Sequence, residues 1–153
     1  MKLNEKQAYA YSRILAGANV FITGPGGVGK SVLINKLREE YDHETIFLAS
    51  TGVAAQNIKG STIHRMFQFS LGFLTREQRR KISDKVKSLF SGGSGDNIKR
   101  IVIDEISTVR CDLLAAIDMQ LRVAKKTLKP FGGIQIVLVG DFYQLSPIVK
   151  RNT

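Results

Sequence analysis

The chain has 153 residues, 43% hydrophobic and 24% charged, which is a size and composition that fit one folded domain. Its 23 lysine and arginine residues outnumber 13 aspartate and glutamate residues, giving a net charge of +10. This excess favours a polyanionic partner, either nucleic acid or an anionic membrane, with a merely soluble basic surface as the alternative. The single cysteine, Cys111, excludes a disulfide framework and a cysteine-based zinc site.

The apolar pattern excludes two kinds of targeting segment. The start, MKLNEKQAYA, contains no apolar region typical of a secretory signal. No apolar run approaches the roughly 20 residues that span a bilayer, so we expect no membrane partner. The sequence therefore indicates a soluble protein of a reducing, intracellular compartment, which is the cytoplasm, nucleus or nucleoid.

Helical and strand patterns alternate along the chain. Asn4 and Gln7 resemble a capping box that opens a helix, with Asn in place of Ser or Thr. Continuous β-branched runs at 20–23, 46–49, 101–103 and 134–139 indicate strands buried on both faces, as in a parallel sheet. Segment 113–128 carries a helical apolar stripe: Leu113, Leu114, Ile117, Leu121, Ala124 and Leu128. The alternation predicts an α/β domain with right-handed crossovers.

Two segments concentrate the positive charge. Segment 75–90 holds Arg76, Arg79, Arg80, Lys81, Lys85 and Lys87 against Glu77 and Asp84. Segment 121–130 holds Arg122, Lys125, Lys126 and Lys129 without an acidic residue. Charge runs of this kind are typical of solvated helix faces. Between the two segments, SGGSGDN at 91–97 predicts a flexible loop.

A glycine-rich segment follows the first predicted strand. GPGGVGKS matches the phosphate-binding pattern G-x-x-x-x-G-K-[ST] in full. Backbone N–H groups of such a loop surround phosphates, Lys30 would contact the β- and γ-phosphates, and Ser31 would bind Mg²⁺. The predicted nucleotide-binding residues are Gly24, Pro25, Gly26, Gly27, Val28, Gly29, Lys30 and Ser31. The strand before the segment and the helical pattern after it favour this interpretation over a glycine-rich turn without a ligand.

An acidic pair ends the strand predicted at 101–103. Ligands of open parallel sheets bind at the carboxyl ends of the strands. Asp104 would hold Mg²⁺, directly or through water, and Glu105 would orient and deprotonate the attacking water. A Glu directly after the Asp favours hydrolysis of ATP over transfer to another substrate. A solvated acidic pair that merely ends a strand is the alternative.

The last predicted strand leads into GDFYQL at 140–145. The strand that precedes the phosphate-binding segment, or P-loop, has neighbours in the sheet. A polar group just after such a neighbouring strand can sense the γ-phosphate, and Gln144 is the candidate for this role. An ordinary turn would explain the same residues. A GTPase is not favoured, because no N-K-x-D sequence occurs, and NKLR at 35–38 lacks the Asp.

Four segments together resemble one family: GPGGVGKS (24–31), STGVAAQNIKGSTIHRMF (50–67), IDEIS (103–107) and FGGIQIVLVGDFYQL (131–145). Their order and spacing are similar to the first lobe of a superfamily 1 DNA helicase of the Pif type (petite integration frequency), a relative of RecD. The resemblance covers nearly all of residues 1–153. It implies a RecA-like P-loop NTPase fold, a parallel sheet with helices on both faces, ATP and Mg²⁺ as cofactors, and single-stranded, duplex or forked DNA as partners. It also implies roles in DNA repair, recombination and telomere maintenance.

The resemblance assigns further roles. LNEKQ at 3–7 looks like the glutamine motif of the family, which implies that Gln7 reads the adenine edge through its amide. The predicted DNA-binding residues that match family motifs are Thr51, Gly52, Thr62, His64 and Arg65. Such groups contact phosphate without reading sequence. Gln144 becomes the residue that links the state of ATP to the grip on DNA.

Structural roles compete with some of these assignments. His64 is also consistent with a core or helix-capping histidine. Phe67, Phe69 and Phe73 can stack on bases, although their spacing is typical of a core. This sequence also departs from the family at Thr108, where Met is common, and at Ser146, where Pro is usual.

The resemblance implies a second RecA-like lobe whose arginines close on the γ-phosphate, and residues 1–153 do not include one. We therefore expect the chain to be the amino-terminal motor lobe of an ATP-dependent DNA helicase, with 5′-to-3′ movement implied by the family. Alone, the lobe should be nearly inactive. The alternatives are a short, non-catalytic ATP- and nucleic-acid-binding protein and a loader ATPase of the AAA type.

Overall fold

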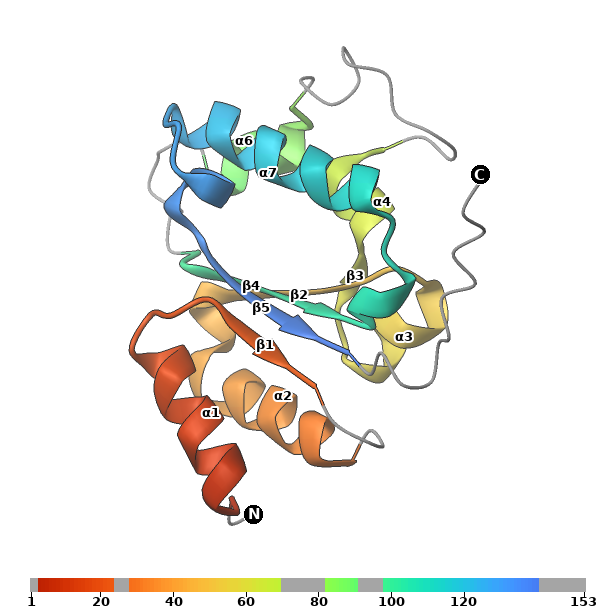
Figure 1. The fold of residues 1–153 in the computed structure, drawn as a ribbon. Coiled ribbons are helices and arrows are strands. Elements are labelled where there is room, and N and C mark those ends of the chain that lie inside the picture. Colours follow the sequence, from red (N-terminus) through yellow and green to blue (C-terminus); the bar gives the residue numbers. More distant parts are fainter. Residues whose placement is uncertain (1–2, 24–27, 70–81, 91–97, 141–153) are drawn as a thin grey trace, which may run out of the picture.

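The computed structural model of the chain describes residues 3–23, 28–69, 82–90 and 98–140. They form a parallel sheet between two layers of helices, as Figure 1 shows. The strands are β1 (Val20–Ile22), β2 (Thr45–Ala49), β3 (Ser61–Thr62), β4 (Arg100–Asp104) and β5 (Gln135–Val139). Their order across the sheet is β1-β5-β4-β2-β3, and every pair is parallel. The four predicted strands are confirmed, whereas β3 is new, because a pair of residues leaves no apolar run in the sequence.

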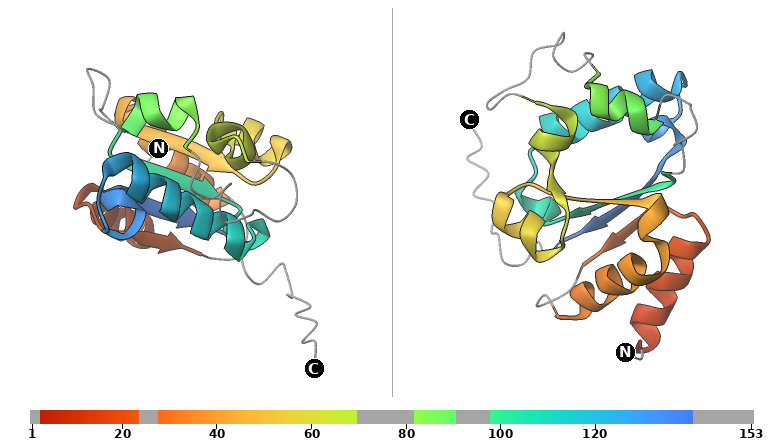
Figure 2. Two further views of the ribbon diagram at one scale, coloured as in Figure 1. Left: turned by 90° about the horizontal axis from the view of Figure 1, so that it is seen from above. Right: turned by 180° about the vertical axis from the view of Figure 1, so that it is seen from behind.

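The helices occupy both faces of the sheet. They are α1 (Glu5–Leu15), α2 (Val28–Tyr41), α3 (Gly52–Asn57), α4 (Ile63–Phe67), α6 (Asp84–Phe90) and α7 (Cys111–Lys125). Short 3₁₀ turns form η1 (Asp42–Glu44), η2 (Ile106–Thr108) and η3 (Pro130–Gly133). Helices α1 and α2 lie on one face, and α4, α6 and α7 lie on the other, which the view from behind in Figure 2 also shows.

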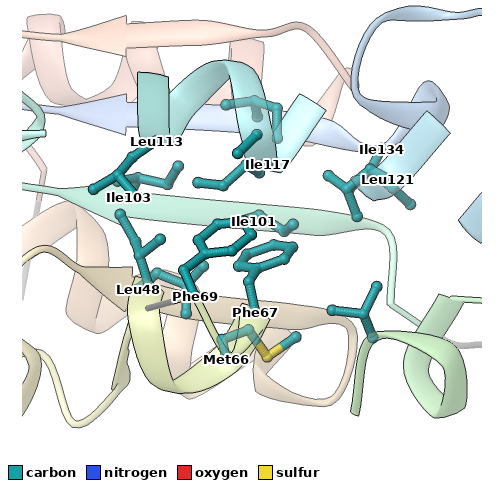
Figure 3. Close-up of a cluster of buried hydrophobic side chains, with 14 of the residues drawn as sticks. Leu48, Met66, Phe67, Phe69, Ile101, Ile103, Leu113, Ile117, Leu121 and Ile134 are labelled. Carbon is teal, nitrogen blue, oxygen red and sulfur yellow. The ribbon is translucent and has the colours of Figure 1, made fainter. Parts of the chain in front are cut away.

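Each face of the sheet has its own apolar core. Ile101 and Ile103 point toward α4, α6 and α7, whereas Val102 between them points toward α1 and α2. Successive side chains of a strand alternate between faces, so a continuous apolar run is needed to fill both cores. Figure 3 shows the first core, where α4 and α7 meet the sheet.

The stripe predicted on segment 113–128 is correct except at its end. Leu113, Ile117, Leu121 and Ala124 are buried along α7, and Leu114 is partly buried. Leu128 is 89% exposed, so its assignment to the stripe was wrong. The helix stops earlier, because Lys126 adopts a left-handed conformation (φ 52°, ψ 48°) that caps it after Lys125.

The two described phenylalanines of the base-stacking hypothesis belong to the core. Phe67 and Phe69 are 1% and 8% exposed, and their rings stack on each other with centroids 5.5 Å apart. Their surfaces are therefore covered by protein and not open to bases. Phe73 lies outside the described residues, as does the loop predicted at 91–97.

The described basic residues of the two charged segments are exposed or partly exposed. Lys85 and Lys87 of α6 are exposed, as are Lys126 and Lys129 beyond α7. Arg122 is paired within α7 to Asp118, Nε to Oδ1 at 2.8 Å. These positions agree with solvated helix faces.

A buried network of polar side chains lies at the amino ends of β2, β4 and β5. Arg100 donates to Gln135 Oε1 from Nε at 2.9 Å and to Thr45 Oγ1 from Nη1 at 3.0 Å. Gln135 in turn donates from Nε2 to the carbonyl oxygens of Ile14 and Ala18, each at 2.7 Å. The network fixes α1 against the sheet at the end opposite the candidate site.

Candidate active site

The carboxyl ends of neighbouring strands bring the predicted residues to one edge of the sheet. Asp104 at the end of β4 is level with Ala49 of β2, and Ala49 is level with Thr62 of β3. Thr51 follows two residues after Ala49, and α2 with Lys30 starts beyond the carboxyl end of β1. Residues from distant parts of the sequence thus share the edge at which open parallel sheets bind their ligands.

The described part of the P-loop is the first turn of α2, which contains Gly29, Lys30 and Ser31. Residues 24–27 and the side chain of Val28 lie outside the described part of the chain. Beside this turn is a pocket of about 290 Å³ between α1, β1 and α2. Its lining residues are Asn4, Lys6, Gln7, Ala10, Phe21, Ile22, Thr23, Gly29, Lys30 and Leu33.

Gln7 connects this pocket to the helix cap. Its N–H donates to Asn4 Oδ1 at 2.9 Å, and its Oε1 accepts from Asn4 N–H at 3.0 Å, so the predicted capping box is confirmed. Its Nε2 donates to the carbonyl oxygen of Gly29 at 3.2 Å. The role of Gln7 in reading adenine remains a prediction.

The acidic pair has two different environments. Asp104 is partly buried, and burial raises the pKa of its carboxyl above the ordinary 3.8, aided by the charge of Glu105. The hydrogen bond from Glu105 N–H to Asp104 Oδ1 (2.9 Å) and the charge of Lys30 oppose this rise in pKa. Lys30 of the P-loop is therefore close enough to Asp104 for its charge to act on this carboxyl. Glu105 itself is exposed.

The polar side chains at this edge include oxygen ligands of the kind that Mg²⁺ uses together with phosphates. Among the residues that the structure describes, no three His, Cys, Asp or Glu side chains gather around one point. Mg²⁺ keeps several waters and binds through one or two protein oxygens together with substrate phosphates. The hydroxyl of Ser31 and the carboxylate of Asp104 are oxygens of the required kind.

The two threonines of the predicted DNA site cap helices. Thr51 Oγ1 accepts from Ala54 N–H at 3.2 Å at the start of α3, and Thr62 Oγ1 accepts from Arg65 N–H at 3.1 Å at the start of α4. A threonine before a helix is a strong cap signal that was available in the sequence. Their contact with DNA remains a prediction.

The remaining DNA-site residues follow these caps. Gly52 is exposed at the first position of α3, and His64 and Arg65 occupy the first turn of α4. His64 is partly buried and Arg65 is exposed, so the histidine is not a fully buried core residue.

The predicted phosphate sensor Gln144 lies outside the described residues. Gly140, the last described residue, donates from N–H to the carbonyl oxygen of Ile22 at 3.0 Å. The chain therefore leaves β5 beside the carboxyl end of β1, the strand that precedes the P-loop.

Two polar residues at this edge were not singled out as site residues by sequence reasoning. Ser50 Oγ and Thr108 Oγ1 are hydrogen-bonded to each other, and Thr108 Oγ1 also donates to the carbonyl oxygen of Glu105 at 2.8 Å. The departure from the family at Thr108 was the only signal of this contact in the sequence.

Comparisons with known proteins cover nearly the whole chain. A family model described as PIF1-like helicase matches residues 2–153. ATP-dependent DNA helicase PIF1 of Candida albicans is 39% identical over 153 residues, which are 97% of this chain and 17% of that protein. ATP-dependent DNA helicase RRM3 of Saccharomyces cerevisiae is 41% identical over 139 residues, which are 88% of this chain and 19% of that protein.

A solved structure agrees with the fold. The Pif1 helicase from Bacteroides in complex with ADP-AlF3 and ssDNA matches with a TM-score of 0.83 and 37% identity, over 99% of this chain and 35% of that one. The chain spans about a fifth of the length of the Candida albicans and Saccharomyces cerevisiae helicases. None of the helices described here is both long and apolar enough to cross a membrane.

Proposed function

This chain belongs to the PIF1-like helicase family, and we propose that it is the amino-terminal, ATP-hydrolysing motor lobe of a longer ATP-dependent DNA helicase. The observation that supports this proposal is the carboxyl edge of the sheet: Asp104, Thr51 and Thr62 lie at or just beyond the ends of the neighbouring strands β4, β2 and β3, and Lys30 lies in the helix that follows β1. A second RecA-like lobe in the remaining length of the protein would complete the site.

ATP would bind with its phosphates at the amino end of α2. The helix dipole and Lys30 would attract the β- and γ-phosphates, while Ser31 and Asp104 would hold Mg²⁺. Mg²⁺, when bound, would neutralise charge on the phosphate oxygens. Glu105, exposed beside Asp104, would orient the attacking water and accept its proton.

Single-stranded DNA would bind at the adjacent ends of β2 and β3. The helix caps at Thr51 and Thr62 present hydroxyl and N–H groups suited to phosphate, and Arg65 adds a positive charge. The Bacteroides helicase was solved with ssDNA, which supports this class of partner. Duplex and forked DNA would be the substrates of the whole protein.

ATP binding would draw the two lobes together, and hydrolysis would let them part. Alternating grip on the strand by each lobe would then give one step per ATP, in the 5′-to-3′ direction implied by the family. Such a motor would act where DNA lies, in the cytoplasm, nucleus or nucleoid.

The test compares the ATPase rate of this chain with that of the full-length protein, each with and without single-stranded DNA. We expect slow hydrolysis by the chain and strong stimulation by DNA in the full-length protein, because arginines from a second lobe are worth roughly 10³–10⁵ in rate. Duplex unwinding by the isolated chain at the full-length rate would contradict the proposal. So would a full-length ATPase that is indifferent to DNA.

A further inference from the structure

A short path of hydrogen bonds joins the segment that precedes α3 to the acidic pair. Thr108 Oγ1 donates to the carbonyl oxygen of Glu105 at 2.8 Å and is hydrogen-bonded to Ser50 Oγ. A hydroxyl carries one proton, and Thr108 gives its proton to Glu105. Ser50 is therefore the donor to Thr108, and the path runs from Ser50 through Thr108 to Glu105.

The ends of this path belong to two different parts of the candidate site. Ser50 lies between Ala49, the last residue of β2, and Thr51, the cap of α3. Glu105 follows Asp104, which is level with Ala49 in the sheet. The path crosses between neighbouring strand ends and links residues 58 positions apart.

Glu105 needs support in the conformation that it adopts. Its backbone is left-handed (φ 56°, ψ 44°), which is unfavourable for a residue with a β-carbon. Thr108 holds the carbonyl oxygen of Glu105 with two donors, its hydroxyl and its own N–H at 3.0 Å. On the other side, Asp104 Oδ1 accepts from the Glu105 N–H. Because the backbone conformation sets the direction in which the side chain leaves, these bonds orient the carboxylate.

We propose that Thr108 is a positioning residue for Glu105, and that its hydrogen bond with Ser50 makes this orientation respond to DNA bound at Thr51. The inference rests on the proposed function. A DNA phosphate bound at Thr51 would shift the adjacent residue Ser50. This shift would change the hydrogen bond between Ser50 and Thr108, and with it the hydrogen bond from Thr108 to the carbonyl oxygen of Glu105. The second state that this coupling requires would be a right-handed backbone at Glu105, which is the more favourable region for a residue with a β-carbon.

Such coupling is reciprocal, so it can be measured by binding alone. If single-stranded DNA changes the affinity for ATP by some factor, ATP changes the affinity for DNA by the same factor. The probes are a non-hydrolysable ATP analogue and oligo(dT), titrated on the full-length protein. The measured quantity is the affinity for the analogue with saturating oligo(dT) divided by that without it.

Two substitutions at Thr108 separate its hydroxyl from its bulk. Thr108→Val keeps the shape but loses the donor, and we expect the coupling factor to fall roughly fivefold, the effect of losing one hydrogen bond of about average strength. Thr108→Ser keeps the hydroxyl and is expected to retain most of the coupling. DNA stimulation of the ATPase should follow the same order.

Ser50→Ala tests the other end of the path without touching the hydrogen bond from Thr108 to Glu105. It should lower the coupling factor, and adding Thr108→Val should cause little further loss, because both variants break one path. Ser88→Ala is the matched control, since this exposed serine donates to the carbonyl oxygen of Lys85 on α6 at 2.9 Å. It should leave the coupling factor unchanged.

Unchanged coupling in both Thr108→Val and Ser50→Ala would overturn the inference, as would equal losses in Thr108→Ser and Thr108→Val. If thermal unfolding shows that Thr108→Val does not fold, the coupling factors of Ser50→Ala and Thr108→Ser test the inference instead. Failure of the proposed function is a different result, namely a wild-type protein that binds neither the analogue nor oligo(dT).

Discussion

The side-chain amide of Gln7 donates a hydrogen bond of 3.2 Å to the backbone carbonyl oxygen of Gly29. This contact joins the first turn of α1 to the first turn of α2, which contains the P-loop lysine. A β-carbon on Gly29 would lie 3.2 Å from Gln7 Nε2, so glycine allows the close approach. The capping box of α1 is therefore hydrogen-bonded directly to the P-loop turn of α2.

Gln7→Ala should lower the affinity for ATP roughly fivefold and weaken the preference of the protein for ATP over GTP, since one net hydrogen bond contributes about 1 kcal/mol. Titrations with both nucleotides measure this change. Asn4→Ala is the control, because it removes the capping partner and leaves the Gln7 amide in place. It should cost about 1 kcal/mol of stability but keep the nucleotide preference. Equal preference in the two variants would contradict the adenine role.

Lys30→Ala should weaken binding of Mg-ATP by roughly 10- to 100-fold, because charge-assisted hydrogen bonds to phosphate contribute about 1.5–3 kcal/mol. Isothermal titration calorimetry on the 153-residue chain measures this affinity. Lys36→Ala on the same helix is the matched control, since Lys36 pairs at the surface with Glu40, Nζ to Oε1 at 2.7 Å. The prediction fails if the two variants bind ATP alike.

Asp104→Asn should stabilise the chain in metal-free buffer at neutral pH. Burial raises the pKa of this carboxyl in the folded state above 3.8, so the charged form opposes folding, and the folded state binds the proton more tightly than the unfolded chain does. The wild type therefore gains stability as the pH falls through the raised pKa. The difference between the two proteins should be largest at neutral pH and vanish toward pH 3.8. Urea unfolding at several pH values measures this difference in stability. A variant that is less stable than the wild type at neutral pH would refute the raised pKa of Asp104.

Substitutions at Thr62 should separate its cap from its proposed contact with DNA. Thr62→Ala loses the cap of α4 and should cost about 1 kcal/mol of stability together with roughly tenfold in oligo(dT) affinity. Thr62→Asp retains a good cap but repels phosphate, so it should keep stability and lose at least as much affinity. Fluorescence anisotropy and thermal unfolding report the two quantities. Normal affinity in Thr62→Asp would exclude a phosphate contact there.

Gly60→Ala should destabilise the fold by about 1–3 kcal/mol, as overpacked cores do. A β-carbon at this position would lie 2.3 Å from the carbonyl oxygen of Phe47 in β2, and that backbone atom cannot move aside. Gly52→Ala is the control for stability, because its β-carbon would meet nothing within 4 Å and alanine favours the helix. Chemical denaturation should show a loss only for Gly60→Ala.

The fold was predictable wherever one strand or helix carries a continuous signal. The runs that became β1, β2, β4 and β5 were visible because both faces of each strand needed apolar residues. Leu128 was misassigned because periodicity continues past the residue at which a helix stops, and the left-handed cap at Lys126 is a backbone choice with no apolar signature. Strand β3 was missed because it is defined by its pairing with β2 rather than by composition.

The sequence alone identified the P-loop and the acidic pair, because both are local patterns whose residue types and spacing suffice to recognise them. It also determined the cap of α1, where donor and acceptor lie three residues apart. Only the tertiary structure decided which of these segments meet. Parallel strands align their carboxyl ends, and that alignment sets Asp104 level with Ala49 and brings Ser50 to Thr108 across 58 residues. Side-chain contacts of this range depend on strand order and register, which no local pattern specifies.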